Sequence, residues 1–231
     1  VIKKYRHRVL LITNNTCPIH CRYCFRKDFP YPQSSPNTHH FREALEFCQK
    51  DESINEIILS GGDPLSLEDE TLDKLFKAIE EIPHIKTIRL HTKYPSIFPE
   101  RITDSLVSTL KQCALNTVCV FHINHPDEIS QHFCDAVQKI KQTNTLTLNQ
   151  SVLLKKVNDN AQVLIDLSHK LFAAGILPYY LHKLDPAKGT HHFKVSDDYA
   201  ELLIQEMKNS LPGYLVPKLA QEIAGQNSKS Y

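Results

Sequence analysis

The chain has 231 residues, of which 41% are hydrophobic and 23% are charged, and its formal net charge is +1. This composition predicts one globular domain with a sizeable core, and the interspersed bases and acids argue against a nucleic-acid or membrane-surface partner. We expect a cytoplasmic protein, because no apolar run approaches the roughly 18 residues of a transmembrane helix and the first residues lack a signal-peptide core.

Short β-branched runs alternate with longer amphipathic stretches, which predicts repeated βα units around a parallel sheet. The expected strands are residues 8–13, 54–60, 87–92, 117–124, 145–153 and 177–183. The expected helices are residues 40–50, 67–81, 100–113, 127–142, 160–174 and 197–210, with Asp127 and Asp159 near two helix starts. Six such units predict an α/β fold of the partial (β/α)6 TIM-like barrel type. No linker or repeat divides the chain, so residues 1–231 are predicted to form a single domain.

Three cysteines, Cys17, Cys21 and Cys24, lie in one short loop after the first predicted strand. Three thiolates on a cubane iron–sulfur cluster leave one iron without a protein ligand, and a small molecule can bind there. The alternatives are a structural zinc site and a chance group of buried thiols. The other cysteines lie on predicted apolar faces, and we expect reduced core residues at Cys48, Cys113, Cys119 and Cys134.

Polar motifs also follow the later strands, where a parallel barrel places its functional loops. The motifs contain Gly61, Gly62 and Asp63 after the second strand, His122 and Asn124 at the end of the fourth, Gln150 in the fifth and Asp185 after the sixth. Glycines let a backbone approach a ligand closely, although a plain strand-to-helix turn uses the same residues. The amides and the histidine suit the binding of ribose or carboxylate groups. The alternative is a structural role, either as buried polar residues with hydrogen-bond partners in the core or as helix caps.

The cysteine spacing, with an aromatic residue before the third cysteine, resembles the signature of radical S-adenosylmethionine (SAM) enzymes. The resemblance implies a [4Fe-4S] cluster on the three cysteines, with SAM bound to its open iron. It also implies that the Gly61-Gly62-Asp63 loop holds the amino group of SAM, with His122, Asn124 and Gln150 as further cofactor-binding residues.

Near its C-terminus, the segment Pro212-Gly213-Tyr214-Leu215-Val216-Pro217, followed by Glu222 and Lys229, resembles the pyridoxal phosphate (PLP) segment of lysine 2,3-aminomutases. Residues 5–8, 122–128, 149–154, 157–159 and 178–180 also have counterparts in that family. The resemblance implies that Lys229 carries PLP and that L-lysine is the substrate. It places Arg26 at the substrate carboxylate, Asp185 and Glu222 at its distal ammonium, and Lys4, Tyr5 and Arg8 around the PLP phosphate.

Within that family, the segments around Phe25 and Leu181 and the Glu222 position resemble the bacterial branch that makes (R)-β-lysine for elongation factor P. This implies functional links to elongation factor P, to its lysyl ligase, and to an electron donor such as flavodoxin or ferredoxin. The alternatives are a catabolic amino-acid 2,3-aminomutase and a metal-binding module without catalysis. The family's extra N-terminal and C-terminal segments are missing, so we expect a chain truncated at both ends. Whether it forms a homo-oligomer is left open.

Overall fold

The computed structural model describes residues 1–27 and 38–222. Its described residues form one sheet in the order β1-β2-β3-β4-β5-β6-β7-β8. The strands are β1 (Ile2–Tyr5), β2 (Arg8–Asn14), β3 (Glu56–Gly61), β4 (Thr87–Thr92), β5 (Asn116–Phe121), β6 (Leu146–Val152), β7 (Leu177–His182) and β8 (Lys218–Ala220). β1 is antiparallel to β2, and every later pairing is parallel. The six predicted strands and the open α/β barrel are confirmed, and the sheet gains one short strand at each edge.

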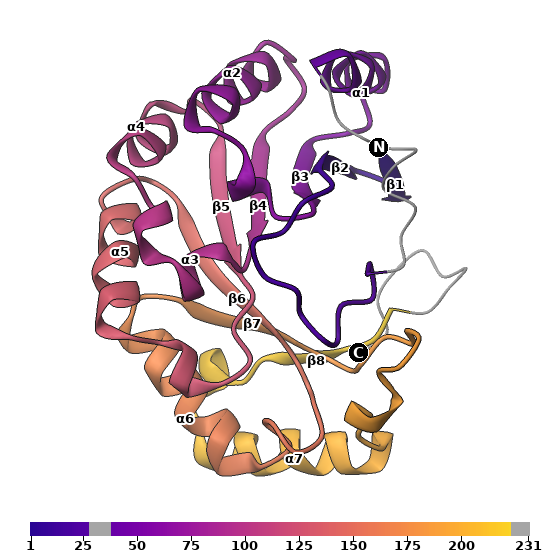
Figure 1. Cartoon of the computed structure of the whole chain (residues 1–231), viewed down its shortest axis with the longest axis vertical. Helices are drawn as coiled ribbons and strands as arrows, with labels where there is room; N and C mark the ends of the chain where they lie inside the picture. The colour runs from indigo at the N-terminus through magenta and orange to yellow at the C-terminus, as the bar shows by residue number, and fades with distance from the viewer. Residues whose placement is uncertain (28–37, 223–231) are drawn as a thin grey trace.

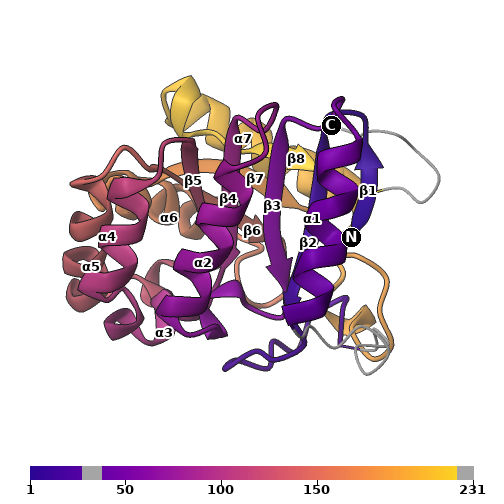
Figure 2. The ribbon, with the colours of Figure 1, turned by 90° about the horizontal axis from the view of Figure 1, so that it is seen from above.

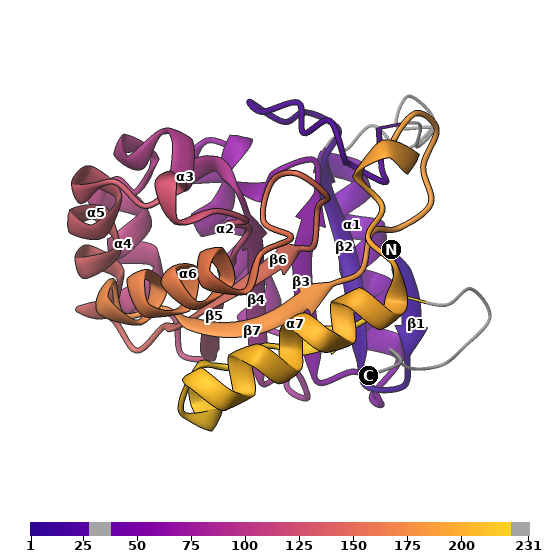
Figure 3. The ribbon, with the colours of Figure 1, turned by 90° about the horizontal axis from the view of Figure 1, so that it is seen from below.

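Helices cover the outside of this sheet, as the alternating pattern predicts. They are α1 (Thr38–Lys50), α2 (Asp69–Glu80), α3 (Tyr94–Ile97), α4 (Asp104–Gln112), α5 (Gln131–Lys141), α6 (Ala161–Ala173) and α7 (Asp197–Ser210). In Figure 1 they form an outer arc around the strands, while the dark loop that follows β2 lies inside the arc. Figure 2 shows α1 and α2 on the side of β2 to β4, and Figure 3 shows α6 and α7 beside β7.

Side-chain caps begin α4, α5 and α6, and all three helices start later than the sequence predicts; α4 begins at Asp104 after the Thr103 cap, where residue 100 was expected. The helix expected from Asp127 begins later, because Ser130 accepts a hydrogen bond from the Phe133 amide and caps α5. Residues 126–128 form a separate 3-10 turn. Similarly, the side chain of Asn160 caps α6, one residue after the predicted Asp159. Each correction shortens a helix at its N-terminus and leaves its buried face unchanged.

The core lies between the sheet and the helices. Its largest fully buried side chains include Phe76, Phe121 and Phe133, and a second apolar cluster forms where α6 and α7 pack over β7. Cys48 and Cys119 are buried, as predicted, whereas Cys113 and Cys134 are only partly buried. In residues 1–27 and 38–222, no helix is both long enough and apolar enough to cross a membrane.

The two edges of the open sheet are joined by side chains. Lys4 in β1 forms an ion pair with Glu222, which follows β8, and the Tyr5 hydroxyl donates to Glu222 Oε1 at 3.0 Å. The Arg8 guanidinium lies 3.9 Å from the centroid of the Tyr5 ring. These contacts bring the beginning of the described chain next to its end, although no backbone pairing links β1 to β8.

Candidate active site

A cavity of about 300 Å³ opens at the C-terminal ends of the parallel strands. It is lined by nearly all the described residues that the sequence predicted for the site, namely Tyr5, Arg8, Cys17, Cys21, Cys24, Arg26, Gly61, Gly62, Asp63, His122, Asn124, Gln150, Asp185 and Glu222. Lys4 reaches this site through its ion pair with Glu222. Lys229 lies outside the described residues. Side chains that are far apart in the sequence thus share one cavity.

Backbone hydrogen bonds join the loop after β3 to the start of the cysteine loop. The Gly62 amide donates to the Asn14 carbonyl at 2.9 Å, and the Asp63 amide donates to the Thr16 carbonyl at 3.0 Å. A Cβ atom at Gly62 would overlap the Thr16 carbonyl oxygen. Gly61 has a φ of +120°, where a side chain is strained. Both glycines are therefore required by close packing of the two loops, and their contact with SAM stays a prediction.

The carboxylate of Asp63 holds the loop after β4. Its Oδ1 accepts from the Thr92 hydroxyl at 2.7 Å and from the Leu65 amide at 3.0 Å. Its Oδ2 accepts from the amides of Lys93 and Tyr94 at 2.7 and 3.0 Å. Burial raises the pKa of Asp63, and these hydrogen bonds oppose that rise. Four donors of the chain already occupy the carboxylate, so Asp63 positions the loop after β4, and its contact with SAM stays a prediction.

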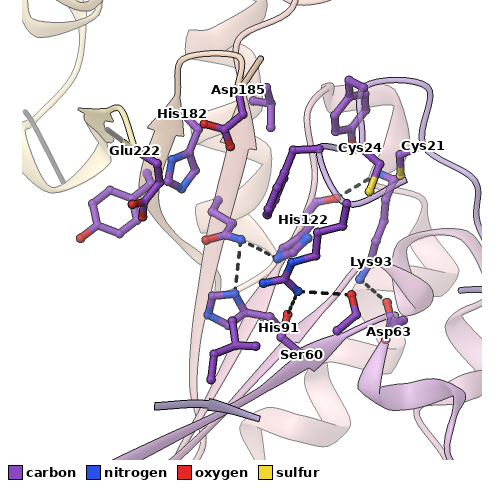
Figure 4. A pocket seen from close by; sticks show the side chains of 18 of the residues that line it. Cys21, Cys24, Ser60, Asp63, His91, Lys93, His122, His182, Asp185 and Glu222 are labelled. Atoms are coloured by element: carbon purple, nitrogen blue, oxygen red, sulfur yellow. Dashed lines mark hydrogen bonds between the residues drawn. The ribbon is translucent and has the colours of Figure 1, made fainter. Parts of the chain in front are cut away.

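The three predicted cluster ligands lie on one side of the cavity, and Figure 4 shows Cys21 and Cys24 close together. Partial burial of the sulfur, the nearby Asp63 carboxylate and charge on Cys24 and Cys21 raise the pKa of Cys17 to about 12. Burial also raises the pKa of Cys21. The sulfurs are thus near enough to repel one another as thiolates, which a cationic iron core would relieve.

A single metal ion and an iron–sulfur cluster place different demands on the three cysteines. In the part of the chain that the structure describes, no three His, Cys, Asp or Glu side chains converge on one ion. A zinc site requires such convergence, whereas a cubane gives each thiolate its own iron. The described residues therefore contain no preformed single-ion site, and the cluster on the three cysteines stays a prediction.

A histidine and amide network forms the middle of the cavity wall. Gln150 Nε2 lies 2.6 Å from His122 Nε2 and 3.4 Å from His91 Nδ1. The two imidazole rings meet edge to face, with centroids 5.6 Å apart (Figure 4). The side-chain amide of Gln150 can thus hydrogen-bond to both imidazole rings. Gln150 in β6 thereby links His91 in β4 to His122, which directly follows β5.

The charged groups predicted for the substrate lie around the same space. Arg26 Nη1 donates to Ser60 Oγ at 3.1 Å and to the Gly61 carbonyl at 3.2 Å. Asp185 and Glu222 line the cavity from the β7 and β8 side, and Figure 4 shows Glu222 across the cavity from Cys21 and Cys24. The cavity therefore holds one guanidinium and two carboxylates, and one of these carboxylates, Glu222, lies across from Cys21 and Cys24.

Two supporting groups were missed by the sequence reasoning. Lys93 forms an ion pair with Glu128 and donates to the His122 carbonyl at 2.9 Å. Arg89 donates from Nε to Glu56 Oε1 at 2.9 Å, with both side chains largely buried. Their positions in the sequence could have identified them, because Lys93 directly follows β4 and Arg89 lies within it. Charged residues in or just after a barrel strand are candidates for the lining.

Comparison with known proteins agrees with this site. Residues 11–167, more than half of the chain, match the family model of the Radical SAM superfamily. An L-lysine 2,3-aminomutase of Haemophilus influenzae is 48% identical over 230 residues, which cover 100% of this chain and 68% of the relative. An L-lysine 2,3-aminomutase of Escherichia coli is 46% identical, and the match covers 100% of this chain and 67% of the relative.

The chain belongs to the radical SAM superfamily. Within that superfamily it is a member of the L-lysine 2,3-aminomutase family, whose enzymes are isomerases. Both expected resemblances are confirmed at this level. The elongation factor P branch stays a prediction.

Solved structures support the fold. A spore photoproduct lyase variant has a TM-score of 0.58 and 14% sequence identity. The match covers 89% of this chain and 74% of the lyase chain. A radical SAM methyltransferase from Sphaerobacter thermophilus has a TM-score of 0.52 at 14% identity. The match covers 79% of this chain and 55% of the methyltransferase chain. At this identity the likeness concerns the partial barrel alone.

Proposed function

We propose that this protein moves the α-amino group of L-lysine to its β-carbon, using a [4Fe-4S] cluster, SAM and PLP. The observation that supports this most is the composition of one cavity. It combines three cysteines, the guanidinium of Arg26 and two carboxylates, and the carboxylate of Glu222 lies across from Cys21 and Cys24. A substrate with a carboxylate at one end and an ammonium at the other matches this distribution of charge.

The cofactors and the residues have separate tasks. When bound, the cluster and SAM supply one-electron chemistry that generates a hydrogen-abstracting carbon radical, and PLP supplies a conjugated system that spreads an unpaired electron. Arg26 presents parallel N–H donors to the substrate carboxylate. Asp185 and Glu222 accept from the distal ammonium and fix the length of the substrate. Flavodoxin or ferredoxin is the class of electron donor that we propose.

Lys229 is the residue that we propose to carry PLP, as an amine that must be neutral when it reacts. Tyr5, Arg8 and Lys4 would then lie near the phosphate. The position of Arg8 beside the Tyr5 ring supports this, because the guanidinium lines the cavity next to β1. A Lys229→Ala variant should no longer trap PLP when treated with borohydride. Trapping that persists would remove Lys229 from this role.

Lys4 and Lys3 offer a matched test of the phosphate site. Neighbouring residues of a strand point to opposite faces, and Lys3 pairs with Asp51 whereas Lys4 pairs with Glu222. Removing the ammonium of Lys4 takes a cation from the phosphate side of the cavity. We expect Lys4→Met to raise the Kd for PLP about tenfold, as expected for one lost ion contact of about 1.4 kcal/mol.

Titration of PLP absorbance measures this Kd, with Lys3→Met as the control that leaves it unchanged. An unaltered Kd in Lys4→Met, together with a lower KM for lysine, would contradict the phosphate role. That result would mean that Lys4 acts only as a competitor for the Glu222 carboxylate.

We further propose that the β-lysine product is destined for elongation factor P. Support comes from Glu222, whose position resembles that branch and whose carboxylate is here engaged by both Lys4 and Tyr5. An acid already in an ion pair binds a substrate ammonium less tightly, so slow turnover of free lysine is expected. Co-expression with elongation factor P and its lysyl ligase should yield a factor whose hydrolysate contains β-lysine. A hydrolysate containing only α-lysine would contradict this destination.

The general activity is tested with the anaerobically reconstituted protein, SAM, PLP and a reductant. L-lysine should stimulate release of 5′-deoxyadenosine, while L-norleucine, which has the same carbon chain without the distal ammonium, should not. Equal stimulation by norleucine would show that Asp185 and Glu222 do not select the substrate.

A further inference from the structure

Two consecutive residues of β1 hold the two oxygens of the Glu222 carboxylate. The Lys4 ammonium forms an ion pair with Oε2, and the Tyr5 hydroxyl donates to Oε1 at 3.0 Å. Adjacent residues of a regular strand point to opposite faces, but the pairing of β1 with β2 is irregular between Ile2 and Tyr5. An irregularity of this kind redirects side chains. Both side chains therefore reach one acid, and that acid lines the cavity.

The two contacts of Glu222 differ in charge. An ionised carboxylate only accepts, so the Tyr5 phenol keeps its proton and donates it as a neutral group. Burial and then the charge of Glu222 raise the pKa of Tyr5 to about 12, which agrees with this role. Lys4 instead contributes a primary ammonium at the end of a four-carbon chain. The same group forms the distal end of L-lysine, so Lys4 occupies Glu222 as the proposed substrate would.

The ion pair between Lys4 and Glu222 is one that a competing charge can open. Its two side chains are 30% and 33% exposed, and an ion pair with this access to water contributes little to stability. A second anion site lies close to the same ammonium. Lys4 Nζ lies 5.8 Å from the centroid of the Tyr5 ring, and the Arg8 guanidinium lies 3.9 Å from that centroid. An anion bound by Arg8 would therefore attract Lys4 as well.

We propose that Lys4 is shared between Glu222 and the cofactor phosphate, so that phosphate binding weakens its hold on Glu222 and makes this acid available to the substrate's distal ammonium. The inference rests on the proposed function, which places the PLP phosphate near Arg8 and the distal ammonium at Glu222. Tyr5 is then a positioning residue, because its hydrogen bond keeps Glu222 in place while the cation on the other oxygen changes. By linkage, the phosphate and the substrate ammonium each strengthen the binding of the other.

The test compares PLP with pyridoxal, which lacks the phosphate, each at saturating concentration in the full chain without SAM or a reductant. The Kd values of L-lysine and of L-norleucine are measured from the change in cofactor absorbance. Their ratio isolates the contribution of the distal ammonium, because norleucine has the same carbon chain without it. We expect the preference for lysine to be roughly two- to fivefold larger with PLP than with pyridoxal, as for the weakening of a partly exposed ion pair.

Lys4→Met removes the competing ammonium, so its preference for lysine over norleucine should be the same with both cofactors. With pyridoxal, that preference should exceed the preference of the unaltered protein. Lys3→Met is the matched control, because Lys3 pairs with Asp51 and not with Glu222, and it should keep the difference between the cofactors. Equal preferences in the unaltered protein, or a difference that persists in Lys4→Met, would overturn the sharing of Lys4.

Tyr5→Phe tests the positioning role, since it keeps the ring beside Arg8 and removes only the hydroxyl. The preference for lysine should fall with both cofactors, while the difference between the cofactors remains. Equal weakening of lysine and norleucine would contradict this role, because it would show a general effect on the cavity. If the unaltered protein did not prefer lysine to norleucine with either cofactor, the ammonium site of the proposed function would be wrong, and the inference would fall with it.

Discussion

Replacing Gly62 by alanine is expected to abolish cluster binding and to destabilise the fold. The new Cβ atom would overlap the Thr16 carbonyl oxygen and approach Asn14 Oδ1, so the loops after β2 and β3 must move apart. Neither obstacle is the end of a flexible side chain, because one is backbone and the other is a buried amide. Overpacking of this kind costs about 1–3 kcal/mol, which corresponds to a fall in Tm of roughly 2–12 °C.

Thermal unfolding and iron content per chain measure the two effects of Gly62→Ala. Gly213→Ala is the matched control, because a Cβ atom there meets no heavy atom within 4 Å. The control should keep both the Tm and the iron content of the unaltered protein. If Gly62→Ala also kept both, the close contact between the two loops would not be what positions the cysteines.

Replacing Arg26 by lysine is expected to lower kcat/KM for lysine by roughly 30- to 150-fold. Arg26 is held by Ser60 Oγ and the Gly61 carbonyl, which orients its planar guanidinium in the cavity. Lysine keeps the charge but loses the parallel pair of donors. A lost hydrogen bond to a charged group costs about 2–3 kcal/mol, and each 1.36 kcal/mol is tenfold in rate.

Initial-rate kinetics separate the causes of a lower kcat/KM. Most of the loss should be in KM, because the carboxylate contact is made before and throughout the reaction. Arg22→Lys serves as the control in the same loop, since Arg22 is exposed and lies 5.3 Å from the Phe193 ring centroid. A loss confined to kcat, with KM unchanged, would show that Arg26 does not hold the ground-state substrate.

The central parallel strands could be predicted because each is a buried β-branched run, as Ile57 and Ile88 illustrate. The edge strands could not, for local reasons. β1 carries Lys3 and Lys4 and forms by pairing with β2, while β8 has only three residues. α3 spans four residues, with Pro95 in its first turn, which is too short for a helical pattern. These elements form because the neighbouring strand or loop is already in place.

In the candidate site, too, features that are local in sequence could be predicted, and contacts between distant residues could not. The three cysteines and the glycine loop are local in sequence, so their spacing was informative. The roles of Asp63 and Asn124 depend on partners from other strands, and the structure shows Asp63 engaged by four donors of its own chain. Tyr23 was visible only as an aromatic residue in the cysteine motif. Its contact with Asn124 follows from the tertiary placement of the cysteine loop beside the residues that follow β5 and not from any local pattern.

The most direct test of the proposed function follows the migrating nitrogen. The protein, reconstituted with iron, sulfide and PLP under anaerobic conditions, is incubated with SAM, a reductant and L-lysine that carries nitrogen-15 in its α-amino group. The account predicts β-lysine with the label on its β-carbon, formed together with 5′-deoxyadenosine. Release of 5′-deoxyadenosine without labelled β-lysine would contradict the aminomutase activity, even if the cluster and SAM were bound as proposed.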